Sequence, residues 1–315
     1  MTTGGGRRAA GVAPGVASLP AVPIRSPQNE RMKRLRKLHE RRHRQALGAT
    51  LVEGRRFVED ALASGRPIRQ VIFTERFAAA PEGWRLLERL AEAGTALALV
   101  PEALLADVAV TETPQGILAE VEVKPPAPIA ASWWQAARKA PVPVVLLPDR
   151  VQDPGNLGTL LRAVEGLGAA GAIIVPGTVD PFHPRAVRAA AAASLRVELR
   201  SAPSAARAAE EARATGFEVW VADAGGELAA WEVDWSRPAL LIVGNEGAGV
   251  SPEAARSASG RVAIPLAGAV GSLNAAMAGT ILLYEAARQL TSRRAVQGDP
   301  GGAGTPPAHR PAGSS

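Results

Sequence analysis

Short apolar runs and amphipathic stretches alternate along this chain in two blocks. In the first block the pattern predicts strands at residues 70–74, 96–100 and 116–123, and helices at residues 57–63, 81–93 and 101–106. The alternation of strands and helices over about 95 residues is typical of a small α/β domain.

The second block begins near residue 142 and repeats this alternation over a longer stretch. It predicts strands at residues 144–147, 172–175, 197–199, 217–222, 240–243 and 262–266. The helices predicted around them cover residues 156–167, 184–195, 202–214, 251–257 and 272 to about 290. Continuous apolar strands separated by helices are typical of a parallel sheet that helices cover on both faces. We therefore predict an α/β fold with a parallel sheet in the C-terminal block.

Proline and glycine residues mark where these blocks begin and end. The segment KPPAP at residues 124–128 separates the blocks, and both ends of the chain are rich in Gly, Ala and Pro without periodicity. These boundaries predict five segments: a disordered tail (1–25), a first domain (26–123), a proline-rich linker (124–140), a second domain (141–294) and another disordered tail (295–315).

The composition excludes several classes of protein. A chain with 47% hydrophobic and 21% charged residues is of the soluble globular type. The absence of cysteine excludes disulfides and thiolate chemistry, and the four histidines have no metal-ligand spacing, so we expect no bound metal. No apolar stretch approaches the roughly 20 residues that span a membrane, and no apolar region follows the basic residues near the N-terminus. We expect a cytoplasmic protein that does not bind membranes.

Positive charge is concentrated in one segment. Between Arg25 and Arg44 nine basic residues face two acidic ones, a net charge of +7 in a chain whose total is +6. A basic run of this kind is ordinarily a solvated helix face, but the concentration of the whole net charge favours a polyanion such as RNA or DNA. The predicted nucleic-acid contacts are Lys33, Arg34, Arg36, Lys37, Arg41, Arg42 and Arg44.

Three polar, glycine-containing loops each follow a predicted strand. The first runs from Asp149 into a helix that Asn156 can cap, with Arg162 further along it. The second, VGNEGAGVS, carries Glu246, and the third ends at a helix that Ser272 can cap. Taken separately, each is consistent with an ordinary connection, and Arg162 with a surface cation. Because ligands of open α/β sheets bind outside the carboxyl ends of the strands, we expect the loops to converge on one site.

These three loops resemble the ordered motifs of the SpoU (TrmH-type) RNA 2′-O-methyltransferases of the SPOUT superfamily. The matching segments are NLGTLLR at 156–162, LIVGNEGAG at 241–249 and IPLAGAVGSLN at 264–274. The first domain is similar to the ribosomal-protein-like RNA-binding domain of that family, through KLHERRHR at 37–44, VEGR at 52–55 and TPQG at 113–116. The second of these segments adds Arg55 to the predicted RNA contacts.

The resemblance implies a C-terminal domain with a trefoil knot, S-adenosylmethionine as cofactor, an RNA substrate and a homodimer. It implies cofactor contacts at Gly244, Asn245, Gly249, Ile264, Leu266 and Leu273. Arg162 would be the catalytic residue, with Asn156, Glu246, Ser272 and Asn274 around it. The chain departs from many family members in having Ala275 and Ala276 directly after the third motif, where a Val-Ser pair is common.

The implied reaction is methyl transfer to a ribose 2′-hydroxyl, with ribosomal RNA favoured because of the additional RNA-binding domain. An arginine stays protonated in proteins, so an orienting and electrostatic role fits Arg162 better than that of a base. The alternatives are a tRNA 2′-O-methyltransferase and a non-catalytic RNA-binding protein of the same fold. A dehydrogenase on a doubly wound sheet is disfavoured because the chain has no GxGxxG motif opening a helix.

Overall fold

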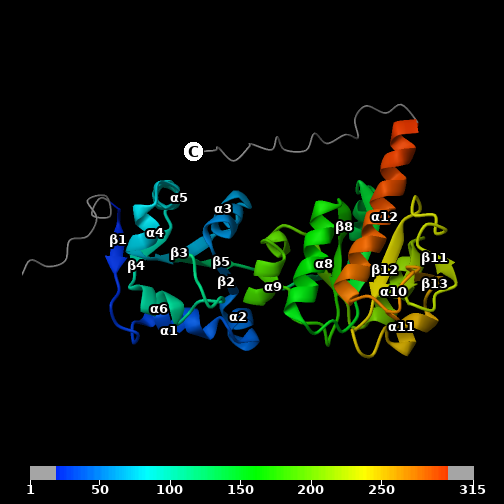
Figure 1. Cartoon of the computed structure of the whole chain (residues 1–315), viewed down its shortest axis with the longest axis horizontal. Coiled ribbons are helices and arrows are strands. Elements are labelled where there is room, and N and C mark those ends of the chain that lie inside the picture. The colour runs from blue at the N-terminus through cyan, green and yellow to red at the C-terminus, as the bar shows by residue number, and fades with distance from the viewer. Residues whose placement is uncertain (1–18, 297–315) are drawn as a thin grey trace, which may run out of the picture.

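Two α/β domains follow one another along the chain (Figure 1). The computed structural model describes residues 19–296. Most of the two predicted tails, residues 1–18 and 297–315, lies outside the described residues. The part of the N-terminal tail that is described is ordered: Ala21–Pro23 forms strand β1, which pairs in parallel with β4. The predicted boundary at residue 25 was therefore wrong, because this short segment completes the edge of a sheet.

The first domain contains a five-stranded mixed sheet in the order β1-β4-β3-β5-β2. Its other strands are β2 (Ala49–Glu53), β3 (Ile68–Phe73), β4 (Ala96–Leu99) and β5 (Ile117–Glu122). Its helices are α1 (Glu30–Lys37), α2 (Arg41–Leu47), α3 (Arg55–Ala63), α4 (Glu75–Ala79), α5 (Pro81–Glu92) and α6 (Glu102–Ala106). The basic helix α1 packs through Met32 and Leu35, which are fully buried, so its basic residues occupy the remaining faces.

The second domain contains an eight-stranded sheet in the order β11-β13-β10-β12-β7-β8-β9-β6. Its strands are β6 (Ala127–Pro128), β7 (Val142–Pro148), β8 (Ala169–Ile174), β9 (Leu199–Ser201), β10 (Glu218–Ala222), β11 (Leu228–Ala229), β12 (Ala239–Val243) and β13 (Gly260–Ala263). Each pairing between these strands is parallel. The predicted parallel sheet is confirmed.

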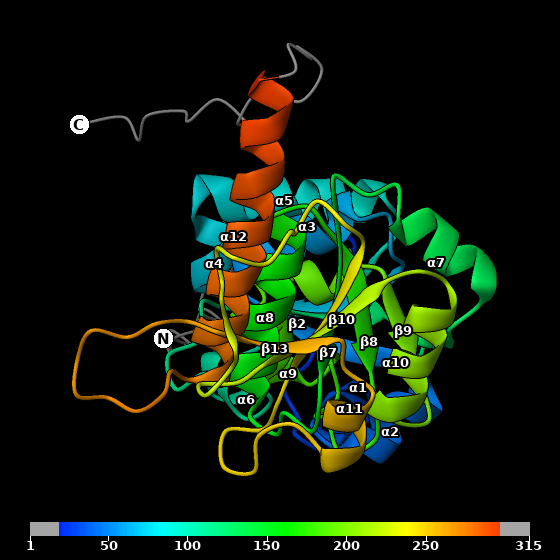
Figure 2. The same cartoon turned by 90° about the vertical axis from the view of Figure 1, so that its right-hand side faces the viewer.

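Helices cover both faces of this sheet, as Figure 2 shows. One face carries α8 (Pro154–Gly166), α9 (Pro184–Ala189) and α12 (Ala275–Val296), and the other carries α7 (Ala131–Ala137), α10 (Ala205–Ala214) and α11 (Pro252–Arg256). The predicted helix at 184–195 is broken after Ala189, because Ala191 and Ala192 adopt positive φ angles before a short 3₁₀ turn.

The segment predicted as a linker belongs largely to the second domain. Strand β6 extends the edge of the eight-stranded sheet, and helix α7 buries Trp133 and Trp134 against the sheet. The ring of Trp134 lies 4.9 Å from that of Phe217 at the start of β10. The prolines of this segment suggested a linker between the domains, but its tryptophans bury too much apolar surface for one.

Two glycines at the helix contacts let α8 pack closely against α9 and α12. A Cβ on Gly158 would lie 2.5 Å from the Ala186 carbonyl oxygen of α9, and a Cβ on Gly279 would lie 2.4 Å from Cδ2 of Leu160. Both glycines therefore let helices approach closely. This packing places the first turns of α8 and α12 side by side.

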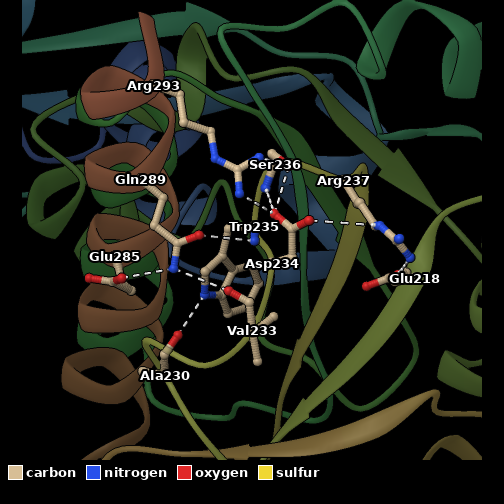
Figure 3. A network of polar contacts seen from close by, with 10 residues as sticks. All are labelled: Glu218, Ala230, Val233, Asp234, Trp235, Ser236, Arg237, Glu285, Gln289 and Arg293. Carbon is tan, nitrogen blue, oxygen red and sulfur yellow. Dashed lines mark hydrogen bonds and ion pairs between the residues drawn. The ribbon is translucent and has the colours of Figure 1, made fainter. Parts of the chain in front are cut away.

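The C-terminal half of α12 is held by the loop between β11 and β12 (Figure 3). Gln289 of α12 accepts a hydrogen bond from the backbone N–H of Trp235 at 3.2 Å and donates one to the Val233 carbonyl at 3.1 Å. The Trp235 indole N–H donates to the Ala230 carbonyl at 2.8 Å, and Arg293 pairs with Asp234 at 3.0 Å. These contacts hold the C-terminal half of α12 in place, several turns away from the first turn of the helix.

The two domains meet through a buried ion pair. Arg44 of α2 and Asp180 of the β8–α9 loop approach to 2.7 Å, and both are at least nine-tenths buried. The guanidinium also donates to the Leu38 and His39 carbonyls, and the Thr50 hydroxyl donates to the Phe182 carbonyl across the same junction. The predicted role of Arg44 as an RNA contact was wrong, because its guanidinium is buried and bonded to Asp180 and to two backbone carbonyls.

Replacing Arg44 with methionine is expected to lower the free energy of unfolding by about 3 kcal/mol, because the Asp180 carboxylate stays buried without a countercharge. Urea unfolding followed by circular dichroism measures the change. Arg42→Met is the control, since it breaks an exposed pair with Glu40 that is worth under about 1 kcal/mol. Equal losses for the two variants would contradict the role of Arg44 at the junction.

Candidate active site

The three predicted loops meet at the carboxyl edge of the eight-stranded sheet. The Asn156 amide on the first turn of α8 donates to the Glu246 carboxylate in the loop after β12. Asn274, just before α12, donates its own amide N–H to Asn156 Oδ1 at 3.1 Å. One side chain from each sequence motif therefore takes part in a single hydrogen-bonded relay, which runs from Asn274 through Asn156 to Glu246.

The direction of the hydrogen bonds in this relay is fixed at its Glu246 end. An ionised carboxylate only accepts, so Asn156 must present its NH₂ to Glu246 and its oxygen to Asn274. Asn274 then presents its NH₂ to Asn156, and its oxygen accepts from the backbone N–H groups of Ala276 and Met277 at 2.9 and 3.2 Å. The relay thus ends by capping α12.

Two predicted caps were wrong. Helix α12 begins at Ala275 and is capped by Asn274, while Ser272 lies in the irregular segment before it. Helix α8 begins at Pro154 and is capped by Asp153, whose carboxylate accepts from the Asn156 N–H at 2.8 Å. In both helices a side chain near the predicted one caps the first turn. Because Asp153 caps α8, the Asn156 side chain is free to reach Glu246.

The loop that carries Glu246 is shaped by its own polar groups. Asn245 Oδ1 accepts from the N–H groups of Gly247 and Ala248 at 2.9 and 3.0 Å, and Asn245 Nδ2 donates to the Arg150 carbonyl at 3.0 Å. The buried Asp149 carboxylate accepts from the Ser251 N–H at 2.6 Å at the far end of the loop. The loop is therefore anchored at both ends to the residues that follow β7.

A cavity of about 360 Å³ opens beside this loop. All six residues predicted to contact the cofactor line it, namely Gly244, Asn245, Gly249, Ile264, Leu266 and Leu273. Of the predicted catalytic residues, Glu246 and Ser272 also line it, whereas Asn156 and Asn274 reach it only through the relay. The structure thus gathers these residues at one place, and their roles stay a prediction.

The sequence reasoning missed one wall of the cavity. Ala222 ends β10 and Asp223 and Ala224 follow it, and Ala255 and Ala278 contribute from α11 and α12. The signal for the first three was present, because the rule that ligands bind at the carboxyl ends of strands applies to β10 as well. Asp223 is a polar residue directly after an apolar strand, like Asp149 after β7.

Within the described residues the cavity is lined by two carboxylates, Asp223 and Glu246, and by no Lys, Arg or His side chain. Arg261 lies behind the rim, where it pairs with Glu227 at 2.6 Å and approaches Asp223 at 3.5 Å. The hydrogen bond from Arg261 holds the pKa of Glu227 below its usual value. A cavity lined by two carboxylates and by no basic side chain suits a ligand that carries positive charge and disfavours a phosphate-bearing one.

Arg162 lies outside this cavity. It is exposed on α8, on the opposite side of the helix from the buried Leu157, Leu160 and Leu161. In the described part of the chain its side chain makes no hydrogen bond or ion pair. A free guanidinium at this place is available to a bound molecule that approaches from solvent.

Most of the predicted RNA contacts pair with acidic groups of the first domain. Lys33 pairs with Glu30, Arg34 with the buried Glu120, Arg36 with Asp107, Arg42 with Glu40 and Arg55 with Glu59. Lys37 and Arg41 are exposed and have no such partner among the described residues. Three of the five acidic partners lie within four residues in the sequence, whereas Glu120 of β5 and Asp107 at the end of α6 are distant in the sequence and could not be foreseen from it.

Two further features are absent from residues 19–296. No group of three or more acidic or histidine side chains is placed to hold a metal ion. No helix combines the length and the apolar character needed to cross a bilayer.

Comparison with known proteins agrees with this site. Residues 143–284 match the SpoU rRNA Methylase family, and residues 29–119 match the MRM3-like substrate binding domain. The chain is 32% identical to the 23S rRNA (guanosine(2553)-2′-O)-methyltransferase RlmP of Bacillus subtilis, over 83% of this chain and 97% of that one. It is 30% identical to the 23S rRNA (uridine(2479)-2′-O)-methyltransferase of Streptomyces viridochromogenes, over 82% and 88%.

A solved structure has the same architecture. The AdoMet-bound rRNA methyltransferase from Sinorhizobium meliloti superposes with a TM-score of 0.74 at 30% identity, over 86% of this chain and 98% of that one. The fold and the site thus define an α/β methyltransferase that uses S-adenosylmethionine. The chain belongs to the SpoU rRNA methylase family, as its motifs suggested. The predicted trefoil knot stays a prediction.

The cavity fits this cofactor. S-adenosylmethionine carries a sulfonium and an ammonium group, and the lining offers two carboxylates, no basic side chain and many apolar groups. Backbone groups of the glycine loop are accessible because Gly244 and Gly249 have no side chains to cover them. A dehydrogenase cofactor with its pyrophosphate does not match this lining, which argues against the alternative of a dehydrogenase.

Gly244→Ala is expected to weaken S-adenosylmethionine binding by about tenfold or more, because its Cβ would lie 2.2 Å from the Gly249 carbonyl carbon and 2.3 Å from the Val250 nitrogen. Isothermal titration calorimetry with the cofactor measures the effect. Gly247→Ala is the matched control, since its Cβ would meet only Asn245 Oδ1, at 3.6 Å. Equal affinities of the two variants would show that the loop does not shape the cofactor site.

Proposed function

We propose that this protein methylates a ribose 2′-hydroxyl of ribosomal RNA. The observation that carries the proposal is the relay of Asn274, Asn156 and Glu246 beside a cavity without basic side chains, because it joins all three sequence motifs at one place. The two relatives named for 2′-O-methylation of 23S rRNA support the same substrate. Ribosomal RNA is found in the cytoplasm of bacteria, so we propose a cytoplasmic location as well.

The chain's own residues hold the cofactor and position the parts of the site around it. S-adenosylmethionine, when bound, supplies a methyl group on a positively charged sulfur. The loops after β12 and β13 hold the cofactor in the cavity. The relay holds the loop of Glu246 and the first turn of α12 in a fixed position relative to each other. Alignment of the reacting groups is the main contribution that a protein makes to such a displacement.

Arg162 is proposed to orient the RNA. Its guanidinium is permanently charged and has no acceptor for a proton, so it can clamp a phosphate next to the reactive ribose but cannot deprotonate the hydroxyl. The proton then passes to a phosphate oxygen or to water. Ser272 lies on the cavity wall next to Asn274, where it can contact the same part of the RNA.

The first domain is proposed to bind the RNA through its exposed cations. Lys37 and Arg41 are free of partners among the described residues, and Lys33, Arg36, Arg42 and Arg55 form exposed pairs that RNA phosphates can replace. Arg34 is less available, because its guanidinium makes a bidentate contact with the buried Glu120. An additional domain of this kind favours the larger ribosomal RNA over tRNA.

Homodimer formation is proposed from an exposed apolar stripe on α12. Met277, Ile281 and Tyr284 recur at helical spacing, and their exposed fractions are 54%, 38% and 56%. Val270, in the loop just before, is 63% exposed. Apolar side chains gathered on one helix face are typical of an interface, and the stripe adjoins the active-site loop, so a second copy would cover both.

Arg162→Lys is expected to lower the rate of methyl transfer to ribosomal RNA by about 100-fold, because a lysine cannot make the bidentate phosphate contact. Cofactor affinity should stay unchanged, since Arg162 does not line the cavity. Transfer of labelled methyl groups under single-turnover conditions measures the rate. Arg207→Lys on α10 is the control, and near-full activity of Arg162→Lys would contradict a requirement for guanidinium geometry.

Met277→Asp is expected to convert a dimer into a monomer, because it places a charge in the centre of the apolar stripe. Light scattering after size-exclusion chromatography measures the mass in solution. Val22→Asp is the control, as Val22 is similarly exposed but lies on β1 of the first domain. A wild-type mass of one chain at micromolar concentration would refute the proposed homodimer.

A further inference from the structure

A second cavity, of about 410 Å³, lies at the junction of the two domains. One side is formed by α2 of the first domain, and the other by the segments that follow β8 and β9 of the second. Its volume is in the range of small-ligand sites. None of its lining residues belongs to the cofactor cavity.

One face of α2 looks into this junction cavity. Arg41, Arg44 and Gln45 lie at helical spacing and all three line the cavity. The guanidinium of Arg44 is held by Asp180 and two backbone carbonyls, so most of its donors are already used within the protein. Arg41 is exposed and has no partner within residues 19–296, which leaves it as the cation at the mouth.

Proline rings form much of the apolar part of the junction cavity. Four of them line it, two from the inter-domain segment (Pro125, Pro126) and two from the β8–α9 loop (Pro176, Pro181). Gln45 adds an amide with both donors and an acceptor, and none of these is used by another described residue. Proline rings, an amide and a cation together suit a nucleobase with its phosphate, since unpaired bases are recognised by packing on their faces and by hydrogen bonds to their edges.

The junction cavity lies on the same edge of the sheet as the methyl-transfer site. The order β10-β12-β7-β8-β9 puts the cofactor cavity at the ends of β10 and β12 and the junction cavity at the ends of β8 and β9. Three strand spacings separate them, roughly 14 Å. Between them the Arg150 N–H donates to the Thr178 hydroxyl of the β8–α9 loop at 3.1 Å, and the Arg150 carbonyl accepts from Asn245 at 3.0 Å.

We propose that the junction cavity takes one unpaired nucleotide of the substrate RNA, a near neighbour of the nucleotide that is methylated. Its base lies between the proline rings with an edge toward Gln45, and its phosphate contacts Arg41. The first domain thereby helps to set which nucleotide reaches the cofactor, because α2, which the Arg44–Asp180 pair holds against the β8–α9 loop, forms one side of the junction cavity. This inference rests on the proposed function.

The test uses the full chain and fluorescein-labelled single-stranded hexaribonucleotides of uridine, adenosine and cytidine, with fluorescence anisotropy as the readout. Gln45→Trp fills the cavity, and Ala46→Trp puts the same side chain on the neighbouring exposed position, which does not line it. Arg41→Ala removes the cation at the mouth, and Arg85→Ala removes an equal exposed charge from α5, which does not line the cavity. We expect Gln45→Trp and Arg41→Ala to raise the Kd about tenfold for at least one hexamer, and the matched variants to change it less than twofold.

Equal Kd values within each matched pair would overturn the proposal, because the binding would then depend on net charge alone. Tight binding of free uridine or adenosine monophosphate, with no gain for the hexamers, would also overturn it and assign the cavity to a free nucleotide. Methyl transfer to ribosomal RNA by the wild type is measured in parallel. Its absence counts against the proposed function, whereas an unchanged KM for that RNA in Gln45→Trp counts against the junction cavity alone.

Discussion

The carboxylate of Glu246 is the constraint on which the active site depends. It can only accept hydrogen bonds, so it decides which way the amide of Asn156 points, and through it the amide of Asn274. The same relay caps α12, whose first turn forms part of the cofactor cavity. A single charged group thus couples the loop after β12, the first turn of α8 and the start of α12, which lie up to 118 residues apart in the sequence.

The surrounding fold holds these elements in place without taking part in the chemistry. Gly158 and Gly279 let α9 and α12 pack closely on α8, and Gln289 ties the distal half of α12 to the loop before β12. On the other side of the site the Arg44–Asp180 pair joins the first domain to the β8–α9 loop. Because that loop contacts Arg150 and Arg150 contacts Asn245, the position of the first domain is linked to the geometry of the cofactor loop.

Local rules predicted the parallel sheet and the convergence of the three loops, whereas the individual residues expected at the cofactor came from the resemblance to the SpoU family. Apolar strands between helices require a buried parallel sheet, and strand ends collect ligand-binding loops. Side-chain partners distant in the sequence were not predictable in this way. Arg44 looked like its neighbours in a basic run, and only folding brings Asp180 to it. The caps of α8 and α12 were misplaced by three and two residues, because Asp153 and Asn274 compete for the same helix ends as the predicted residues. The wall at Asp223 was missed although the strand-end rule applied to it.

The most direct test of the proposed activity is the position of the transferred methyl group. Purified protein is incubated with S-adenosylmethionine that carries a trideuterated methyl group and with ribosomal RNA that lacks ribose methylation, and the digested nucleosides are analysed by mass spectrometry. We expect one nucleoside whose ribose gains the labelled methyl group, and no gain with Arg162→Ala. Label on a base, or no label in the RNA while the cofactor binds normally, would contradict ribose 2′-O-methylation by this protein.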